Sequence, residues 1–339
     1  MKYSAIDLHS NNSVVVVTDE TDRVLAEKRL PNDLNRIIEF LSPHRDELVG
    51  VVVESTYNWY WLVDGLKAAG YSVRLANTGA VKTYDGLKHS GDEADARHLA
   101  QLLRLGILPE GYICPPDKRA LRDLARRRLQ LARNRTQHIL SIENQVTRQT
   151  GHGILSNAVK QLNAETVDGW GWPVDVAASI KANVAIVQAL NIEIERLELH
   201  LDRAIAATAQ WKLINTVPGI GRTLSRVILL EVGEIARFAS AGNFASYARC
   251  VTSIRISNGK KKGEGNRKNG NKYLSWAFVE AAHFAARFYP EAKRFYQRKL
   301  AKANGAVATK ALAHKLARAV YHILKTGQPF DMQRCFAGG

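Results

Sequence analysis

Four carboxylates stand at positions where they could together bind divalent metal ions. Asp7 and Glu54 each end an apolar, strand-like segment, and Asp92 and Asp95 are three residues apart in a segment with helical spacing. A charge at the end of a buried strand is costly to remove from water unless a cation or a hydrogen-bond donor lies beside it. Oxygen ligands suit Mg²⁺, with Mn²⁺ as the alternative ion, and a pair of such ions about 4 Å apart stabilises the attacking and leaving oxygens of phosphoryl transfer. The four acids therefore predict a metal site for phosphoryl transfer.

A plainer interpretation exists for Asp92 and Asp95, because acidic residues in the first turn of a helix also complement the helix dipole. Asp7 and Glu54 favour the metal site over this alternative. A strand, an aspartate and a hairpin open both ribonuclease-H-like nucleases and actin-like ATPases. The ATPase reading requires glycine in the first turn, where this chain has His9, and it requires a later glycine-rich adenosine loop that residues 1–110 lack. The nuclease type is therefore preferred.

The elements that position these acids alternate between strands and helices, which predicts an α/β layered domain. Residues 2–18 read as two strands joined by a polar turn, and the nearly continuous apolar run at residues 47–55 is typical of a strand covered on both faces. The expected strands lie within residues 2–18, 47–55 and 71–76, and the expected helices within 33–41, 61–69 and 92–103.

The charge of the chain is unevenly distributed and indicates a polyanionic partner. The 339 residues carry a formal net charge of +16, yet residues 1–110 hold 12 Lys and Arg against 16 Asp and Glu, and residues 111–339 hold 36 against 16. Nucleic acid is the first candidate, and a ribosome-associated or membrane-surface role is the alternative. The start shows no signal peptide, no run approaches the ~20 apolar residues of a membrane span, and the three cysteines form no CxxC pair, so a reduced cytosol without structural zinc is expected.

Two long helices are predicted beyond a proline- and glycine-rich boundary at residues 105–117. The first is strongly basic, with eight Lys or Arg and two Asp between Asp117 and Arg135. The basic face of this helix, which includes Arg126, Arg127 and Arg128, either binds the phosphates of a nucleic acid or is simply exposed to solvent. The second, at residues 179–207, carries an apolar stripe, so the two could pair within one chain or between protomers.

Two glycine-containing segments follow in the basic half. Pro218-Gly219-Ile220-Gly221 precedes a helix and resembles a helix-hairpin-helix turn, whose backbone contacts a phosphate, although a tight connection between helices is the alternative. The segment before the predicted helix 273–288 is expected to have little regular structure, and it is either a flexible linker or an active-site loop that closes on a phosphodiester. Its expected nucleic-acid contacts are Lys260, Lys261, Lys262, Arg267, Lys268 and Lys272.

Taken together, these motifs resemble one family over nearly the whole chain. Asp7, Glu54 and the Asp92-x-x-Asp95 element, followed far downstream by a serine and the lysine-rich segment, resemble the DEDD transposases of insertion sequences (the IS110 family), with the Piv-type DNA invertases and bridge-RNA-guided recombinases. The lysine-rich segment is similar to a subgroup with shorter loops.

The resemblance implies an α/β plus α architecture: a ribonuclease-H-like (RuvC-like) DEDD domain at 1–112, a helical coiled-coil region at 113–208 and a mostly helical transposase domain at 209–339. It implies that the four acids form a Mg²⁺-binding tetrad and that Ser257 is a nucleophile, with Ser253 as the alternative because many relatives have Ser-Ser-Gly where this chain has Ser257-Asn258-Gly259.

The same resemblance implies partners and a location. They are donor and target DNA, a non-coding bridge RNA that pairs with both, and a homodimer that assembles into a tetramer, in the nucleoid-associated cytoplasm of a bacterium. Two other classes stay open: a metal-dependent junction-resolving nuclease that forms no covalent intermediate, and a non-catalytic nucleic-acid-binding scaffold.

Overall fold

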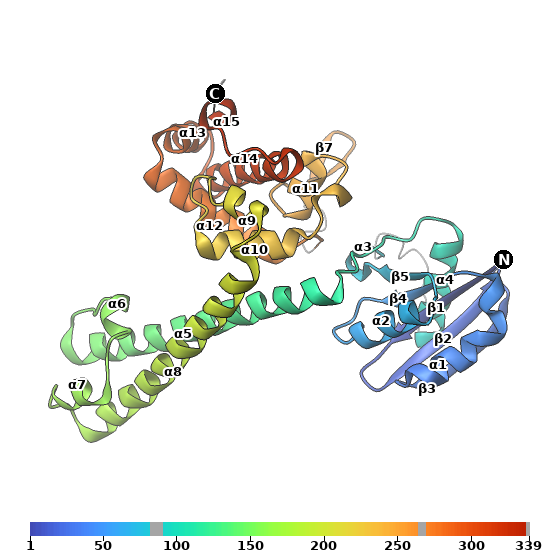
Figure 1. The fold of residues 1–339 in the computed structure, drawn as a ribbon. Helices are drawn as coiled ribbons and strands as arrows, with labels where there is room; N and C mark the ends of the chain where they lie inside the picture. Colours follow the sequence, from blue (N-terminus) through green and yellow to red (C-terminus); the bar gives the residue numbers. More distant parts are fainter. Residues whose placement is uncertain (82–90, 264–268, 337–339) are drawn as a thin grey trace. The chain divides into compact units, whose positions relative to one another are not determined.

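The structure is a computed structural model that describes residues 1–81, 91–263 and 269–336. The chain divides into two compact units, Met1–Pro116 and Asp117–Gly339. Figure 1 shows the mixed sheet of the first unit and the helices of the second. The predicted three-part division, with boundaries at 112/113 and 208/209, stays a prediction.

The first unit is built on a five-stranded mixed sheet in the order β3-β2-β1-β4-β5 (Figure 1). Its strands are β1 (Lys2–Leu8), β2 (Asn12–Asp19), β3 (Val24–Pro31), β4 (Leu48–Glu54) and β5 (Val73–Ala76). β2 is antiparallel to β1 and β3, whereas β1, β4 and β5 run parallel. The sheet confirms the α/β prediction and is consistent with a ribonuclease-H-like fold. The edge strand β3 was not predicted.

Helices cover both faces of this sheet, and the alternation of side chains along each strand decides what faces them. The helical elements are α1 (Leu34–Leu41), η1 (Ser42–Glu47), α2 (Tyr60–Ala68), α3 (Thr78–Val81) and α4 (Asp92–Arg104). Ile6 and Val53 belong to the core beneath α1 and α2, whereas Ala5 and Val52 pack with apolar residues of α4. Asp7 and Glu54 are two residues beyond Ala5 and Val52, so both acids end their strands on the face that α4 covers.

Two arginines fasten α4 to the strands beside it. Arg97 donates to both carboxylate oxygens of Glu27 in β3, at 2.6 and 2.7 Å. Arg104 donates to both oxygens of Asp22, in the turn before β3, each at 2.6 Å. Bidentate pairs of this kind fix geometry as well as adding energy. They orient α4 so that its acidic first turn lies at the end of the sheet where Asp7 and Glu54 are found.

The second unit begins with two long helices that pair antiparallel within one chain (Figure 1). They are α5 (Pro116–Thr150) and α8 (Val174–Ile205), joined through α6 (Ser156–Val159) and α7 (Ala164–Asp168). Ile142 and Val146 of α5 share a buried core with Ile180 and Val184 of α8. This packing answers the question left open by the sequence, because the apolar stripes already meet inside one molecule.

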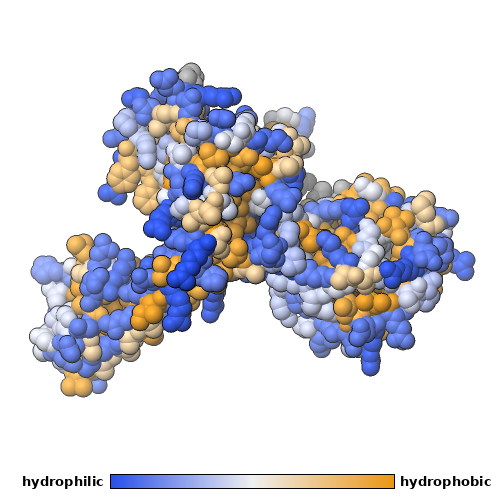
Figure 2. All heavy atoms as spheres, in the orientation of Figure 1, coloured by the Kyte–Doolittle hydropathy of each residue, from blue (hydrophilic) through white to orange (hydrophobic). Residues whose placement is uncertain are grey.

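The rest of the second unit is largely helical. Its elements are α9 (Ala209–Ile214), α10 (Arg222–Val232), η3 (Ile235–Arg237), α11 (Ala241–Tyr247), β6 (Arg255–Ser257), β7 (Lys260–Gly263), α12 (Lys272–Phe288), α13 (Pro290–Leu300), α14 (Gly305–Thr326) and α15 (Met332–Phe336). Phe244, Phe278, Leu312 and Leu316 are fully buried at its centre. Figure 2 shows hydrophobic side chains as patches among hydrophilic ones on the visible face of the molecule. Within the described ranges, no helix is long and apolar enough to cross a membrane.

The prediction of little regular structure before α12 was wrong for residues 255–263, which form the two-stranded hairpin β6–β7. The reason is the turn between the strands. Asn258 and Gly259 both have positive φ, 50° and 69°, as a type I′ turn requires, and Asn-Gly is the preferred pair for that turn.

Candidate functional site

Asp7 and Glu54 form the buried part of the acidic site. Asp7 is only 4% exposed and Glu54 is half-buried. Burial, a hydrogen bond with Asp7 and the charges of Asp7 and Asp95 raise the pKa of Glu54 to about 8. Glu54 therefore retains a proton at neutral pH, in a hydrogen bond with Asp7, because two adjacent carboxylates cannot both ionise easily when water is excluded. A divalent cation between them would remove this repulsion.

Asp92 reaches the same place from the first turn of α4. Arg29 of β3 donates to its Oδ2 at 2.7 Å, and this hydrogen bond holds the pKa of Asp92 below its usual range. Arg29 also contacts Glu93 at 3.2 Å. Asp95, one turn further along α4, is exposed but close enough to Glu54 to add to the rise of its pKa. The structure thus brings Asp92 beside Asp7 and places both Asp7 and Asp95 near Glu54.

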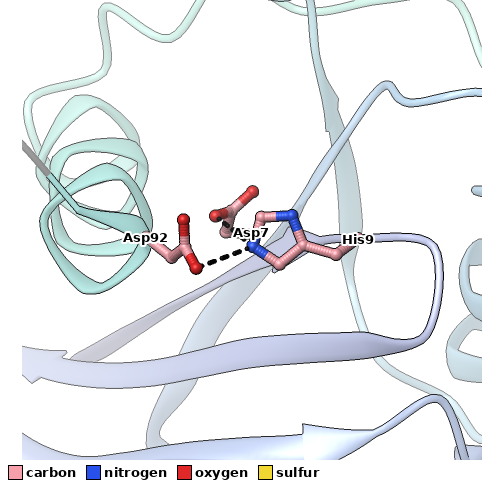
Figure 3. Close-up of side chains that lie close together, drawn as sticks. All are labelled: Asp7, His9 and Asp92. Carbon is pink, nitrogen blue, oxygen red and sulfur yellow. Dashed lines mark ion pairs between the residues drawn. The ribbon is translucent and has the colours of Figure 1, made fainter.

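His9 is the residue of this site that the sequence interpretation missed. Its Nε2 atom lies 3.2 Å from Asp7 Oδ2 and 3.1 Å from Asp92 Oδ2, between the end of β1 and α4 (Figure 3). One ligand atom from each of the three residues lies within 4.8 Å of the other two. The signal in the sequence is the Asp7-x-His9 spacing at the end of the first strand.

These residues fit a divalent metal ion. The Nε2 atom of His9 is buried and meets no hydrogen-bond partner of suitable geometry in the described part of the chain, despite its short distances to two carboxylates. Two carboxylates and an imidazole directed at one point are a common ligand set for divalent ions. Asp7, Asp92 and His9 would hold the ion, with Glu54 joining them when it loses its proton.

The pKa of Glu54 predicts how metal binding depends on pH. Because the ion displaces one proton from a group whose pKa is about 8, Mg²⁺ affinity should rise about fivefold between pH 7 and 8 and about twofold between pH 8 and 9. Titration calorimetry at the three pH values measures this. In the Glu54→Gln variant the affinity should be lower and independent of pH over this range. Equal wild-type affinity at pH 7 and 9 would contradict the account.

The raised pKa of Glu54 also makes the stability of the metal-free protein depend on pH. The pKa of Glu54 is raised in the folded chain from the ordinary value of 4.5. The associated stability is therefore fully present below about pH 4.5 and is lost as the pH rises through about 8. Added metal should reverse this loss, since it stabilises the ionised form.

Ser257 lies at the end of the hairpin in the second unit. It is exposed, is the last residue of β6 and pairs across the turn with Lys260, the first residue of β7. Directly opposed side chains of an antiparallel pair lie on the same face, about 5 Å apart at Cβ, so the Lys260 side chain starts beside that of Ser257. Lys262, two residues along β7, is also exposed, whereas Ser253 precedes the hairpin and is half-buried.

The other predicted contacts of the basic loop lie in different parts of the chain. Lys261 lies between Lys260 and Lys262 in β7, whereas Arg267 and Lys268 lie outside the described residues. Lys272 is exposed at the start of α12, with its Nζ atom 5.3 Å from the centre of the Tyr273 ring. Nucleic-acid binding by these residues stays a prediction.

The three consecutive arginines of α5 point to different surroundings. Arg126 donates to both oxygens of Glu231, at 2.6 and 2.7 Å; burial opposes its charge, but these hydrogen bonds outweigh burial and raise its pKa. Arg128 donates to Glu198 at 2.8 Å. Arg127 is exposed. The internal ion pairs account for Arg126 and Arg128 without nucleic acid, so Arg127 is the member of the three whose position best suits the predicted contact.

Arg127 also lines an open groove between α5 and the start of α12. The groove has a volume of about 500 Å³, and its lining includes Arg133, Lys272 and Tyr273 as well as Arg126 and Arg127. Positive groups beside an aromatic ring suit the phosphates and bases of a single strand.

The two glycines of the predicted helix-hairpin-helix turn differ. Gly219 has φ +78°, and a Cβ atom there would lie 2.1 Å from the Ala281 carbonyl oxygen of α12. Gly221 is the exposed N-cap residue of α10, with nothing within 4 Å of a Cβ atom. Gly219 is thus required for close packing on α12, whereas Gly221 leaves the start of α10 open. Phosphate binding by either glycine stays a prediction.

Gly219→Ala should therefore destabilise the second unit by about 2–5 kcal/mol. The alanine would be forced into a left-handed backbone conformation, and its Cβ atom would overlap the backbone of α12. Gly221→Ala, the matched control, should change stability by about 1 kcal/mol or less. Urea unfolding of the two variants measures the difference. Equal stabilities would show that α12 does not lie against Gly219 as described.

Comparison with known proteins places both units in one group. Residues 5–149 match the family model of the DEDD transposases of IS110, and residues 211–297 match the transposase family IS116/IS110/IS902. A candidate transposase of the mini-circle IS117 from Streptomyces coelicolor is 25% identical over 99% of this chain and 96% of its own length. An uncharacterized 43.6 kDa protein of insertion element IS110 from the same organism is 29% identical over 36% of this chain and 29% of its own length.

The matched regions contain the features described above. The DEDD model spans the sheet, Asp7, Glu54, Asp92 and Asp95, and a DEDD catalytic domain implies metal-dependent catalysis. The second model spans the serine hairpin, and a transposase binds DNA. The chain is an enzyme with a DEDD catalytic domain and belongs to the IS110 family of transposases.

Proposed function

We propose that this protein is the recombinase of an insertion sequence, which cuts and rejoins DNA strands with Ser257 as its nucleophile and is guided by a bridge RNA that pairs with donor and target DNA. The observation that carries the proposal is that Asp7 lies beside Asp92 and His9 on one side and beside Glu54 on the other, with the pKa of Glu54 raised by burial, Asp7 and Asp95. An acidic group of this kind is stable at neutral pH only with a proton or a cation in it.

The residues of this group would hold Mg²⁺, with Mn²⁺ as the alternative. When bound, the ion supplies positive charge that stabilises the oxygens of a phosphodiester during transfer. Asp7 is fixed by β1 and Asp92 by the ion pairs of α4, so the ligands are held before the ion arrives. Asp95 is exposed and close to Glu54, where it could bind a second ion or a water molecule of the first.

Ser257 is proposed as the nucleophile because of its position at the end of the hairpin. Its Oγ atom would form a bond with the phosphorus of a DNA strand while the bond from phosphorus to the leaving deoxyribose oxygen breaks. The serine proton passes to a base, and the leaving oxygen gains a proton. Lys260, opposite Ser257 in the hairpin, would offset the negative charge that builds on the phosphate oxygens. The resulting phosphoserine bond keeps the energy needed for rejoining.

The basic second unit is proposed to hold the nucleic acids mainly through their phosphates. Lys260 and Lys262 of the hairpin are exposed, as are Arg127 and Lys272 beside the groove. Contacts of this type do not read sequence by themselves. Choice of the donor and target sites is therefore assigned to the RNA, and a homodimer or tetramer would bring two strands together.

Strand exchange should depend on the RNA that copurifies with the protein. Protein purified from cells that contain its insertion sequence should carry one discrete non-coding RNA, identified by sequencing, and should join donor and target DNA. Ribonuclease treatment should abolish joining, and the purified RNA should restore it. Joining that survives ribonuclease would contradict guidance by RNA, whereas a failure to join under any condition would contradict the recombinase itself.

A further inference from the structure

His9 is held in place more firmly than a residue of a surface hairpin needs to be. Its carbonyl oxygen accepts hydrogen bonds from Asn32 Nδ2 at 3.1 Å and from Asn58 Nδ2 at 2.9 Å. Its own N–H donates to the Asn12 carbonyl oxygen at 2.9 Å. The backbone of His9 is thus fixed by the chain beyond β3 and the chain beyond β4, as well as by its own hairpin.

The two asparagines are themselves oriented. Asn32 Oδ1 accepts a hydrogen bond from the Ser13 hydroxyl at 2.7 Å, and Asn58 Oδ1 accepts one from the Thr56 hydroxyl at 2.8 Å. Each amide therefore directs its N–H group toward His9. These hydrogen bonds fix the backbone from which the imidazole of His9 projects, and supporting contacts of this kind are a general feature of built metal and catalytic sites.

The imidazole then places Nε2 between two carboxylates. Its distances to Asp7 Oδ2 and Asp92 Oδ2 are 3.2 and 3.1 Å (Figure 3). Adjacent ligands of an octahedral ion with bonds near 2.1 Å are about 3.0 Å apart. The atom is buried, and by its angles it forms no good hydrogen bond to a described residue, although its closeness to Asp92 adds to the lowering of the pKa of that carboxyl group. A histidine acting only as a counter-ion would direct its N–H group at one of the oxygens.

The hydrogen bond from Arg29 does not prevent Asp92 from binding an ion together with His9. It donates to Asp92 Oδ2 from β3 at 2.7 Å, and a carboxylate has about four lone-pair sites. Asp92 can therefore keep this hydrogen bond and still offer a lone pair on the side that faces His9.

From this geometry we infer that His9 Nε2 is a direct ligand of the catalytic divalent ion, beside Asp7 and Asp92. An all-oxygen site suits Mg²⁺, and a nitrogen ligand shifts the preference of a site toward first-row transition ions. The inference rests on the proposed metal site and deepens it: the site is adapted to an ion such as Mn²⁺ rather than to Mg²⁺ alone.

The test uses the full-length protein without nucleic acid and Mn²⁺ as the probe. Pulsed electron paramagnetic resonance of the bound ion should show coupling to a directly coordinated nitrogen in the wild type. His9→Gln, which places an amide near the position of Nε2, should lose this coupling. It should also lower Mn²⁺ affinity by about tenfold or more, since even the loss of a supporting residue costs about 10–100-fold, and it should lower Mg²⁺ affinity less.

His44→Gln is the matched control, because the ring of His44 lies in the same unit against Lys2. It should keep the nitrogen coupling and both affinities. A wild-type spectrum without nitrogen coupling, or a coupling that persists in His9→Gln, would overturn the assignment of His9. Failure of Mn²⁺ to bind the wild type, or binding that is unchanged in Asp7→Asn, would instead overturn the metal site itself.

Discussion

Asp7→Asn should abolish strand exchange and lower divalent-ion affinity by orders of magnitude, while the chain still folds. Asp7 is the most buried acid of the site and contacts both Glu54 and His9. An amide keeps the shape of the carboxylate but carries no charge. It therefore weakens the metal site, and it also removes the repulsion that raises the pKa of Glu54. Exchange is measured with donor and target DNA, and ion affinity by calorimetry.

Asp33→Asn makes the same chemical change elsewhere in the first unit and is the control. Asp33 is the N-cap of α1, where asparagine serves equally well, so exchange and ion affinity should both be retained. The thermal midpoint of Asp7→Asn without metal should be no lower than that of the wild type. Full exchange by Asp7→Asn would remove the acidic group from the mechanism.

Ser257→Ala should eliminate the covalent link between protein and DNA. The exposed hydroxyl at the end of β6 is the group proposed to attack the phosphate, and the hairpin does not depend on it, since Asn258 and Gly259 form the turn. Denaturing gels with labelled donor DNA should show a protein-linked band for the wild type and none for Ser257→Ala.

Ser253→Ala is the companion variant and should retain the band, because Ser253 is half-buried and lies before the hairpin. A band that persists in Ser257→Ala and disappears in Ser253→Ala would assign the nucleophile to Ser253. Strand cleavage without any linked band would favour a hydrolytic nuclease of the junction-resolving type.

Strand-end positions were predictable from the sequence because they depend on local patterns. Apolar runs ending in Asp7 and Glu54, and the helical spacing of Asp92 and Asp95, placed three elements correctly. Side-chain alternation then put Asp7 and Glu54 on the same face of the sheet.

The contacts between elements were not predictable. Strand β3 has half-exposed and charged residues rather than a clear apolar pattern, so nothing local revealed that Glu27 and Arg29 would hold α4. His9 gains its place from Asn32 and Asn58, which are distant in sequence. Similarly, the positive charges of Arg126 and Arg128 suggested phosphate contacts, but the structure pairs them with Glu231 and Glu198.

The central claim is that the acidic group and Ser257 serve one strand-cleavage reaction. Its most direct test is mass spectrometry of the DNA-linked peptides after protease and nuclease digestion, for the wild type with Mg²⁺, the wild type with chelator, and Asp7→Asn. The account predicts a nucleotide on the peptide that contains Ser257, formed by the wild type with Mg²⁺ and absent in the other two samples. The same modified peptide in the chelated sample or in Asp7→Asn, or cleaved DNA without any modified peptide, would contradict it.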